Sequence, residues 1–481
     1  EVEQMNLFKD MVCYQEEVRD PSRMAEVLNR VIEKAIRGSA PAQINVPRDY
    51  WTQVIDIELP PIVRLERQSG GSDAISKAAD LLSKAKFPVI LSGAGVVIGG
   101  AIEETKKLAE KLDAPVCSGY QHNDSFPGSH PLAAGPLGYN GSKAAMELIS
   151  KADVVLALGT RLNPFSTLPG YGIDYWPKNA SIIQVDINPD RIGLTKKVTV
   201  GISGDAKLVA LQIFEKLSTN AGDSDRQKRK DLIHQTKSAW LQKLSSLDHE
   251  DDDEGTVWNK EARERDKDRM SPRQAWRAIQ LGMPDDVIIS SDIGNNCAIG
   301  NAYPTFEKGR KYLAPGLFGP CGYGFPSILG AKIGCPDTPV IGFAGDGAFG
   351  ISMNEMSSCA REEWPSITMV IFRNYQWGAE KRNTTLWYDN NFIGTELDPN
   401  LSYSKVADAC GLKGVTVKTM EETTAAIRQS CEDQKKGITT FIEVILNQEL
   451  GEPFRRDAMK TPVKVAGIDK KDMRPQKSLN G

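Results

Sequence analysis

The fold is decided by residues 339–374, which read PVIGFAGDGAFGISMNEMSSCAREEWPSITMVIFRN. The apolar run 339–343 stops at a Gly-Asp-Gly turn, and a segment without Gly or Pro, 351–363, follows it. A second apolar run, 367–372, then leads to Arg373-Asn374. Periodicity and turn residues predict a strand, a tight turn, a helix and a second strand, with the two strands parallel.

The residues that follow these two strands have the chemistry of a cation site. Asp346 offers a carboxylate and Asn374 an amide oxygen, and the carboxyl ends of parallel strands meet at one edge of a sheet. Mg²⁺ takes oxygen ligands, some from the protein and the rest from water and phosphates. The glycines beside Asp346 and the start of the following helix allow backbone N–H groups to approach a phosphate. The residues alone leave open an ordinary glycine-rich turn between a strand and a helix.

This spacing resembles the signature of the thiamine diphosphate-dependent enzymes. Its parts here are the Gly-Asp-Gly turn at 345–347, 26 intervening residues and Asn374. The family's motif ends in Asn-Asn, whereas here Arg373 stands in the place of the first Asn. The resemblance implies thiamine diphosphate and Mg²⁺ as cofactors. It also implies Asp346, Asn374 and the backbone carbonyl of Gln376 as the metal ligands.

The same resemblance implies further loops around the cofactor. The turn 293–296 is expected to hold the diphosphate, and the loop 319–321 to hold the aminopyrimidine ring. Cys321 stands where the family has a bulky apolar residue under the bent cofactor, so either a neighbour fills the gap or this wedge is weaker. The cofactor-binding residues expected on this basis are Ile293, Gly294, Asn295, Asn296, Gly319, Cys321, Gly345, Asp346, Gly347, Ala348, Asn374, Gln376, Trp377 and Gly378.

Length and composition restrict the class of protein. At 481 residues, a length of about 150 residues per domain predicts three domains. Hydrophobic residues make up 40% and charged residues 25%, as in ordinary globular proteins, and a net charge of -4 argues against a general nucleic-acid binder. The eight Cys include no CxxC pair, which predicts reduced thiols and a cytoplasmic protein. No apolar run approaches the roughly 18 residues of a membrane helix.

Alternating strand and helix patterns predict an α/β protein with doubly wound, mostly parallel sheets. Near the start, a helix is expected at 20–36 and one strand at 42–46. The resemblance adds a thiamine diphosphate-binding fold with a central Rossmann-like domain. The expected domains are 1–50, the C-terminal remnant of a pyrimidine-binding domain; 73–217, the central α/β domain; 271–450, the diphosphate and Mg²⁺ domain; and 451–481, a C-terminal tail.

Two features of the middle of the chain have a structural as well as a functional interpretation. Gly93-Ala94-Gly95 is only part of a dinucleotide fingerprint, and a structural turn is favoured over a nucleotide site, which stays open. Residues 218–270 contain the basic run 228–230 and the acidic run 250–254. We interpret both runs as solvated faces or loops.

One acyltransferase branch of the family resembles the chain over nearly its whole length. The resemblance is carried by 291–296, 317–324, 373–381 and 449–458. It implies a transferase of taurine and sulfonate metabolism that converts sulfoacetaldehyde and phosphate to acetyl phosphate and sulfite through an acetyl-thiamine diphosphate intermediate. Both substrates are anions, so cationic side chains are expected near the cofactor. The candidates are Lys381, Arg382, Arg455 and Arg456.

Two other functions and one missing residue accompany this hypothesis. An acetolactate synthase has the same Mg²⁺ clamp, and a catalytically silent binding subunit keeps the fold. The family activates its cofactor through a Glu at a strand end that leads into an Ala-rich helix, and residues 1–50 offer no such setting. We therefore expect the catalytic Glu upstream of residue 1, either in a longer protein or in a partner chain. The resemblance further implies a homo-oligomer, a dimer or tetramer, with sites shared between subunits.

Overall fold

The structure is a computed structural model that describes residues 2–61, 65–218, 223–246, 264–316, 318–387 and 391–450. The chain divides into two compact units, Glu1–Arg67 and Gln68–Gly481, which are described separately below. Within the described ranges, no helix has both the length and the apolar character needed to cross a membrane.

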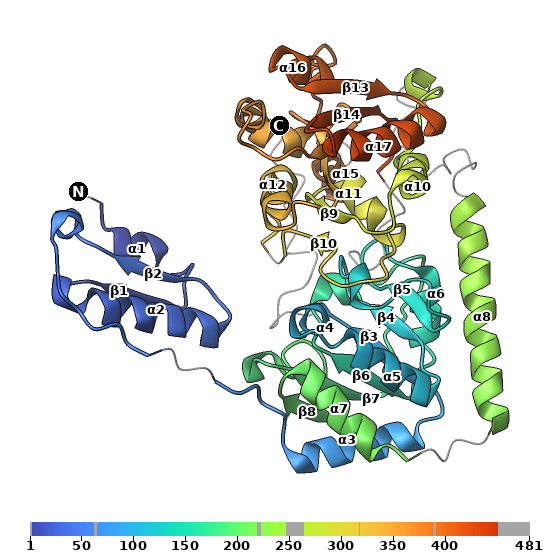
Figure 1. The fold of residues 1–481 in the computed structure, drawn as a ribbon. Helices are drawn as coiled ribbons and strands as arrows, with labels where there is room; N and C mark the ends of the chain where they lie inside the picture. The colour runs from blue at the N-terminus through green and yellow to red at the C-terminus, as the bar shows by residue number, and fades with distance from the viewer. Residues whose placement is uncertain are drawn as a thin grey trace, which may run out of the picture. The chain divides into compact units, whose positions relative to one another are not determined.

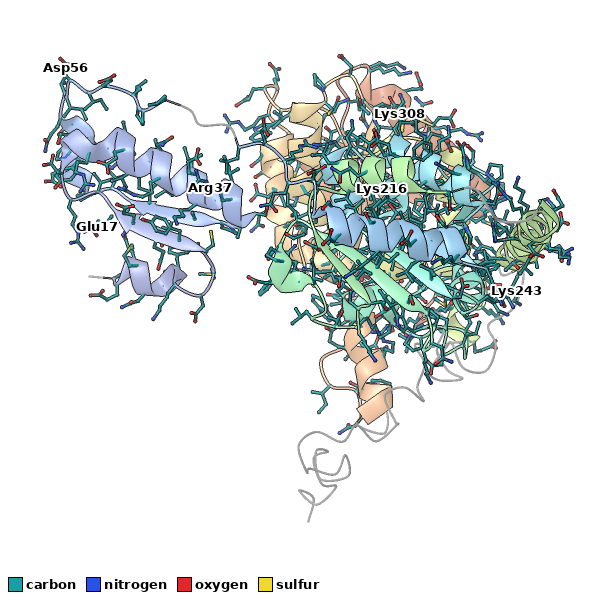
Figure 2. The ribbon with its side chains drawn as sticks, turned by 90° about the horizontal axis from the view of Figure 1, so that it is seen from below. Glu17, Arg37, Asp56, Lys216, Lys243 and Lys308 are labelled. Carbon is teal, nitrogen blue, oxygen red and sulfur yellow. The ribbon has the colours of Figure 1, made fainter. Side chains whose placement is uncertain are left out.

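The first unit is a small two-stranded sheet with one long helix. Its elements are α1 (Gln4–Phe8), β1 (Tyr14–Glu17), α2 (Met24–Gly38) and β2 (Ala42–Asn45). Strand β1 pairs with β2 in parallel, and Val27 and Val31 of α2 pack with Val18 into a minimal core. Figure 2 labels Glu17 on β1 and Arg37 on α2. The predicted helix and the strand at 42–46 are confirmed, but the expectation of a single strand was wrong, because β1 is polar and shows no apolar alternation.

The second unit contains a central domain built on a six-stranded parallel sheet. The strands are β3 (Pro88–Ser92), β4 (Val116–Ser118), β5 (Ala133–Pro136), β6 (Val154–Leu158), β7 (Ser181–Asp186) and β8 (Val200–Ser203). The helices are α3 (Ser72–Lys84), α4 (Ala94–Gly99), α5 (Ile102–Leu112), α6 (Lys143–Ile149) and α7 (Ala206–Lys216). The order β5-β4-β3-β6-β7-β8 starts in the middle and winds outward in both directions, as a doubly wound sheet does. Figure 2 labels Lys216 at the end of α7, where its Nζ donates to Ser76 Oγ of α3 at 2.8 Å.

The glycines after β3 are explained by close packing of two loops. A Cβ atom added at Gly93 would lie 2.6 Å from the carbonyl oxygen of Gly159, and one added at Gly95 would lie 2.7 Å from the Cα of Gly159. No side chain fits between these two backbones. The structural interpretation of Gly93-Ala94-Gly95 therefore has a steric cause, and a nucleotide site is not needed to explain it.

A long helix contains the basic run 228–230, and the interpretation of this run as a solvated face or loop was wrong for its middle residue. Helix α8 (Asp223–Ser246) runs along the side of the central domain, where it packs against α6 (Figure 1). Arg229, in the middle of the basic run, is buried and donates to the carbonyl oxygens of Lys86, Leu112 and Asp113 at 2.8, 2.7 and 3.0 Å. The acidic run 250–254 lies outside the described residues.

The third domain has a second parallel sheet of six strands. Its strands are β9 (Ile288–Ser291), β10 (Tyr312–Leu313), β11 (Val340–Gly345), β12 (Thr368–Arg373), β13 (Lys413–Val417) and β14 (Thr440–Ile445). Its helices are α10 (Pro272–Gly282), α11 (Asn295–Ile299), α12 (Gly324–Gly334), α13 (Asp346–Ser352), α14 (Met356–Cys359), α15 (Gly378–Trp387), α16 (Tyr403–Ala409) and α17 (Met420–Gln434). The strand order is β10-β9-β11-β12-β14-β13, so the direction of winding changes between β9 and β11. Figure 1 shows this domain in yellow to red.

The helix after β11 begins earlier than predicted. Helix α13 begins at Asp346 itself, with Gly345 as an extended N-cap residue, and gives way to a 3-10 turn at Met353–Glu355. The expected helix 351–363 therefore starts five residues too late and is interrupted, and the last helical residue is Cys359. As a result, Asp346 belongs to a helical turn and not to an irregular loop.

Buried polar contacts join the central and third domains. Asn301 follows α11, and its side chain accepts from the backbone N–H of Gln121 at 3.1 Å and donates to the carbonyl oxygen of Tyr139, also at 3.1 Å. The amide of Asn123 donates to the carbonyl oxygens of Asn301 and Pro304, both at 2.8 Å. These contacts hold α11 against the central domain.

Candidate active site

A cavity of about 220 Å³ opens at the carboxyl edge of the third-domain sheet, where the strand order reverses between β9 and β11. Open α/β sheets bind ligands at this position. All fourteen residues predicted to bind the cofactor line the cavity, together with two that were not predicted. The lining consists of Ile293, Gly294, Asn295, Asn296, Gly319, Cys321, Gly345, Asp346, Gly347, Ala348, Asn374, Gln376, Trp377, Gly378, Ala379 and Glu380.

Two walls of the cavity are connected through Asp292, whose side chain is fully buried. Its Oδ1 accepts from the backbone N–H groups of Ile293 and Gly322 at 2.8 and 3.1 Å, and its Oδ2 accepts from Gly324 at 2.7 Å. Burial raises the pKa of this carboxyl, and the three N–H donors oppose that rise. Asp292 thus fixes the turn after β9 relative to the loop before α12.

The turn after β9 requires a glycine. Gly294 has φ +127°, a left-handed conformation that side chains rarely adopt. The turn is fixed at two further points: Trp276 Nε1 donates to the carbonyl oxygen of Asn296 at 2.7 Å, and Asn295 Nδ2 donates to the carbonyl oxygen of Gly378 at 2.9 Å. The second contact links the turn to the first residue of α15.

Asp346 and Asn374 lie side by side, as the predicted parallel strands require. Gly345 pairs with Phe372 in the β11–β12 ladder, so the next residues of both strands leave the sheet at the same edge. Asp346 Oδ1 accepts from the N–H of Gly347 at 3.0 Å, and Oδ2 accepts from the N–H of Tyr375 at 2.7 Å. Burial raises the pKa of the Asp346 carboxyl to about 6, against the opposing effect of nearby Arg373.

Two amide oxygens in the cavity lining are buried without a hydrogen-bond partner: Asn374 Oδ1 and Gln376 Oε1. A buried acceptor without a donor is costly, and a cation is one group that satisfies it. Asn374 Oδ1 and the Asp346 carboxylate are hard oxygen donors of the kind that Mg²⁺ prefers, and both belong to the predicted ligand set. Gln376 Oε1 is a further oxygen of the cavity lining and not the predicted ligand, which is the backbone carbonyl of that residue. The residues present therefore fit the predicted metal, and the glycines of the cavity lining leave room for a diphosphate beside it.

The predicted wedge position is occupied by a small, accessible side chain. Cys321 lines the cavity and is exposed, and partial burial raises the pKa of its thiol. Two isoleucines border the same loop: a Cβ added at Gly319 would lie 3.5 Å from Ile293 Cδ1, and one added at Gly322 would lie 3.2 Å from Ile351 Cγ2. Apolar bulk next to this loop therefore comes from Ile293 and Ile351.

The four cationic candidates have different surroundings. Lys381 is fully buried, forms an ion pair with Glu396 and donates to Gln448 Oε1 at 3.3 Å. The Arg382 guanidinium lies 4.8 Å from the centre of the Tyr139 ring, and burial lowers the pKa of Arg382 to about 10. Arg455 and Arg456 lie outside the described residues.

Sequence reasoning missed three residues of this site. Ala379 and Glu380 lie in the first turn of α15 directly after Gly378, and continuing the predicted loop by two residues would have found them. The role of Asp292 had no signal in the sequence, since its partners Gly322 and Gly324 are far along the chain. The catalytic Glu expected upstream of residue 1 stays a prediction.

The chain matches known proteins in two of its domains and over its whole length. Residues 75–213 match the family described as thiamine pyrophosphate enzyme, central domain, and residues 292–444 match its C-terminal TPP binding domain. The chain is 78% identical over 479 residues to the probable sulfoacetaldehyde acetyltransferase of Rhizobium meliloti (strain 1021), covering 100% of this chain and 81% of that protein. The chain belongs to the sulfoacetaldehyde acetyltransferase family.

Two further relatives and one solved structure show how similarity to this chain falls off outside the family. A sulfoacetaldehyde acetyltransferase of Roseovarius nubinhibens is 73% identical over 476 residues, covering 99% of this chain and 79% of that protein. The probable acetolactate synthase large subunit of Methanococcus aeolicus is only 29% identical over 444 residues, covering 89% of this chain and 72% of that protein. The crystal structure of benzoylformate decarboxylase from Polynucleobacter necessarius has a TM-score of 0.72 at 19% identity, covering 94% of this chain and 79% of that chain. This last likeness concerns the fold alone.

Proposed function

We propose that the protein is a sulfoacetaldehyde acetyltransferase, which converts sulfoacetaldehyde and phosphate to acetyl phosphate and sulfite. The observation that carries the proposal is the identity of 68–78% to three relatives with this name, over at least 99% of the chain. Acetolactate synthases share the fold but are far more distant, at 28–29% identity. The proposed function is therefore that of the relatives with the higher sequence identity, the sulfoacetaldehyde acetyltransferases.

The cavity residues support thiamine diphosphate and Mg²⁺ as the cofactors. In this proposal Asp346, Asn374 and the backbone carbonyl of Gln376 hold the metal, and the turn 293–296 and residues 345–348 hold the diphosphate. When bound there, thiamine diphosphate would supply the carbanion chemistry that the reaction of an aldehyde requires. The protein binds and orients the cofactor, and the buried network around Asp292 keeps the walls of its site in place.

Arg382 is the cation that we propose to attract the two anionic substrates. Its guanidinium lies over the Tyr139 ring, and Tyr139 Oη donates to Asn295 Oδ1 in the cavity lining at 3.4 Å. A partly desolvated guanidinium binds sulfonate and phosphate oxygens more strongly than an exposed one does. Lys381 is less suited, because the Glu396 carboxylate already balances its charge.

We make further proposals about the location, the oligomeric state and the domains of the protein. We propose a cytoplasmic homo-oligomer, a dimer or tetramer, in which residues 1–50 belong to a pyrimidine-binding domain and 73–217, 271–450 and 451–481 form the other parts. The support is the resemblance to the family, the two matched domains and the parallel strands of the first unit. Sedimentation velocity of the purified protein measures the oligomer directly.

An assay of the complete gene product with sulfoacetaldehyde and phosphate tests the function. The chain spans about four fifths of the length of its relatives, so the whole gene product is the proper sample. Sulfite and acetyl phosphate should appear in equal amounts during turnover. Without phosphate, acetyl phosphate should not form, and sulfite release should stop once each active site carries an acetyl group. Carbon–carbon bond formation from pyruvate, with no sulfite release, would show an acetolactate synthase instead. Cofactor binding without turnover of either substrate would show a silent subunit.

A further inference from the structure

Arg373 ends β12, and its side chain is fully buried next to Asp346 of the cavity. One terminal nitrogen, Nη1, donates to Asp346 Oδ2 at 3.1 Å. The other, Nη2, donates to the carbonyl oxygens of Asp398 and Leu401 at 2.5 and 2.9 Å. The Nε atom lies 3.7 Å from Glu443 Oε1 of β14. The guanidinium therefore connects the carboxylate in the cavity to two other segments of the domain.

Glu443 is the fixed end of this arrangement. Its Oε2 accepts from the hydroxyls of Ser402 and Ser404 at 2.7 and 2.9 Å and from the N–H of Ser404 at 3.2 Å. The planar guanidinium of a buried Arg has N–H donors that point in several directions, so it can contact two carboxylates and backbone carbonyl oxygens at the same time. The Glu443 carboxylate is held by Ser402 and Ser404, and the two carbonyl oxygens belong to the backbone. These groups fix Arg373, and Arg373 in turn fixes Asp346.

The same guanidinium supports a strained residue in the metal loop. Tyr375 has φ +61°, although a bulky aromatic residue rarely takes the left-handed conformation. Its ring lies 4.1 Å from the Arg373 guanidinium carbon, and its N–H donates to the Asp346 Oδ2 that Arg373 also contacts. Tyr375 stands between Asn374 and Gln376, so its backbone conformation determines where their oxygen atoms point.

We propose that Arg373 is a positioning residue of the cation site. It holds the Asp346 carboxylate in one orientation and keeps Tyr375 left-handed, so that Asn374 and Gln376 present their oxygens to the cavity before any metal arrives. The proposal rests on the proposed thiamine diphosphate and Mg²⁺ site. An Asn at this position, as in the usual motif of the family, is too short to reach Asp346, Leu401 and Glu443 together. This chain therefore has its own means of preparing the site.

The test measures metal binding in the purified complete gene product, with thiamine diphosphate present and Mn²⁺ as the probe, by electron paramagnetic resonance. Arg373→Asn should weaken Mn²⁺ binding by about 10- to 100-fold, the effect of removing an outer contact of a metal ligand. Arg229→Lys is the control, because Arg229 is also buried and also donates to backbone carbonyl oxygens, three in its case, yet lies on α8. It should lower the melting temperature and leave the Mn²⁺ affinity unchanged.

A second variant separates positioning from general packing. Glycine takes a left-handed conformation freely. The double variant Arg373→Asn/Tyr375→Gly should therefore bind Mn²⁺ about threefold or more tighter than Arg373→Asn alone. If Arg373→Asn does not fold, Arg373→Lys carries the test with the same expected direction, since a lysine keeps the charge but not the fork.

Three results would overturn the proposal. Mn²⁺ binding by Arg373→Asn as tight as in the unaltered protein excludes the positioning role while leaving the proposed function intact. No recovery in the double variant excludes the support of Tyr375. No Mn²⁺ binding by the unaltered gene product removes the proposed cation site and this inference with it.

Discussion

Asp292→Asn is the substitution for which the structure sets the clearest magnitude. The native carboxylate has two oxygens and three backbone donors: Ile293 and Gly322 at Oδ1, and Gly324 at Oδ2. An amide has one oxygen, so in its better orientation it keeps the two donors at Oδ1 and turns an NH₂ group toward the N–H of Gly324. One charge-assisted bond is lost, and two donors then face each other in a buried position.

The free energy of this change follows from the bonds involved. A hydrogen bond to a charged group contributes about 1.5–3 kcal/mol, and a buried donor left unsatisfied costs about 1–3 kcal/mol. Part of that loss is offset. Burial disfavours the charged form of Asp292, which raises its pKa, and a neutral amide does not carry this cost of burying a charge. We therefore expect Asp292→Asn to lower the free energy of unfolding by about 2–3 kcal/mol.

Urea unfolding followed by tryptophan fluorescence measures this loss, and Asp124→Asn is its control. Asp124 is equally buried, but both of its donors, the N–H groups of Lys311 and Tyr312, meet Oδ2. Its Oδ1 has no hydrogen-bond partner, so an amide NH₂ group at that place breaks no existing bond and only exchanges one unpaired buried atom for another. The control should lose less than about 1 kcal/mol. Equal losses in the two variants, or no loss in Asp292→Asn, would refute the reasoning.

Four further outcomes are expected. Asp346→Ala should abolish Mg²⁺-dependent binding of thiamine diphosphate, because the carboxylate ligand is gone; titration calorimetry measures this, and unchanged affinity would contradict the metal assignment. Burial raises the pKa of Asp346 to about 6, and a protonated carboxyl binds metal poorly, so the same affinity should fall as pH drops through that value and stay constant well above it. Arg229→Ala should destabilise the protein by about 2–4 kcal/mol, since three carbonyl oxygens lose their donor, which thermal melting would detect. Gly347→Ala should cost about 1–3 kcal/mol, because the new Cβ would lie 2.8 Å from Trp377 Cε3; a melting temperature equal to that of the unaltered protein would contradict this contact.

The site could be predicted from the sequence where its chemistry follows a strand end. The apolar runs that became β11 and β12 are buried from Val340 to Ala344 and from Thr368 to Arg373, and their order along the chain forces Asp346 and Asn374 to one sheet edge. No distant contact was needed for that inference. The start of α13 was misplaced because glycines favour a turn in isolation, whereas the backbone at Gly345 is extended and helical conformation begins at Asp346.

The missed elements share a physical cause, which is that polar side chains stand where a sequence pattern would need apolar ones. Strand β1 pairs with β2 through its backbone, and its residues, Tyr14–Glu17, carry little apolar surface. Helix α8 buries Arg229, Ile233 and Trp240 on one side. Because one of these buried residues is charged, the apolar periodicity that would predict the helix from the sequence is weak. The partners of Arg373 illustrate the same limit. A sequence shows that an Asn is replaced, but only the fold brings Glu443 within reach.

Arg229 also sets an order of events during synthesis of the chain. The carbonyl oxygens of Leu112 and Asp113 are the open end of α5, and Arg229 is the donor that closes it. The last strand of the central sheet ends at Ser203. A ribosome adds about 5–20 residues per second, so the nascent domain completes its sheet roughly one to five seconds before its helix end is capped. During that interval the domain has its complete sheet but lacks the three hydrogen bonds of Arg229, so it is less stable than the finished domain.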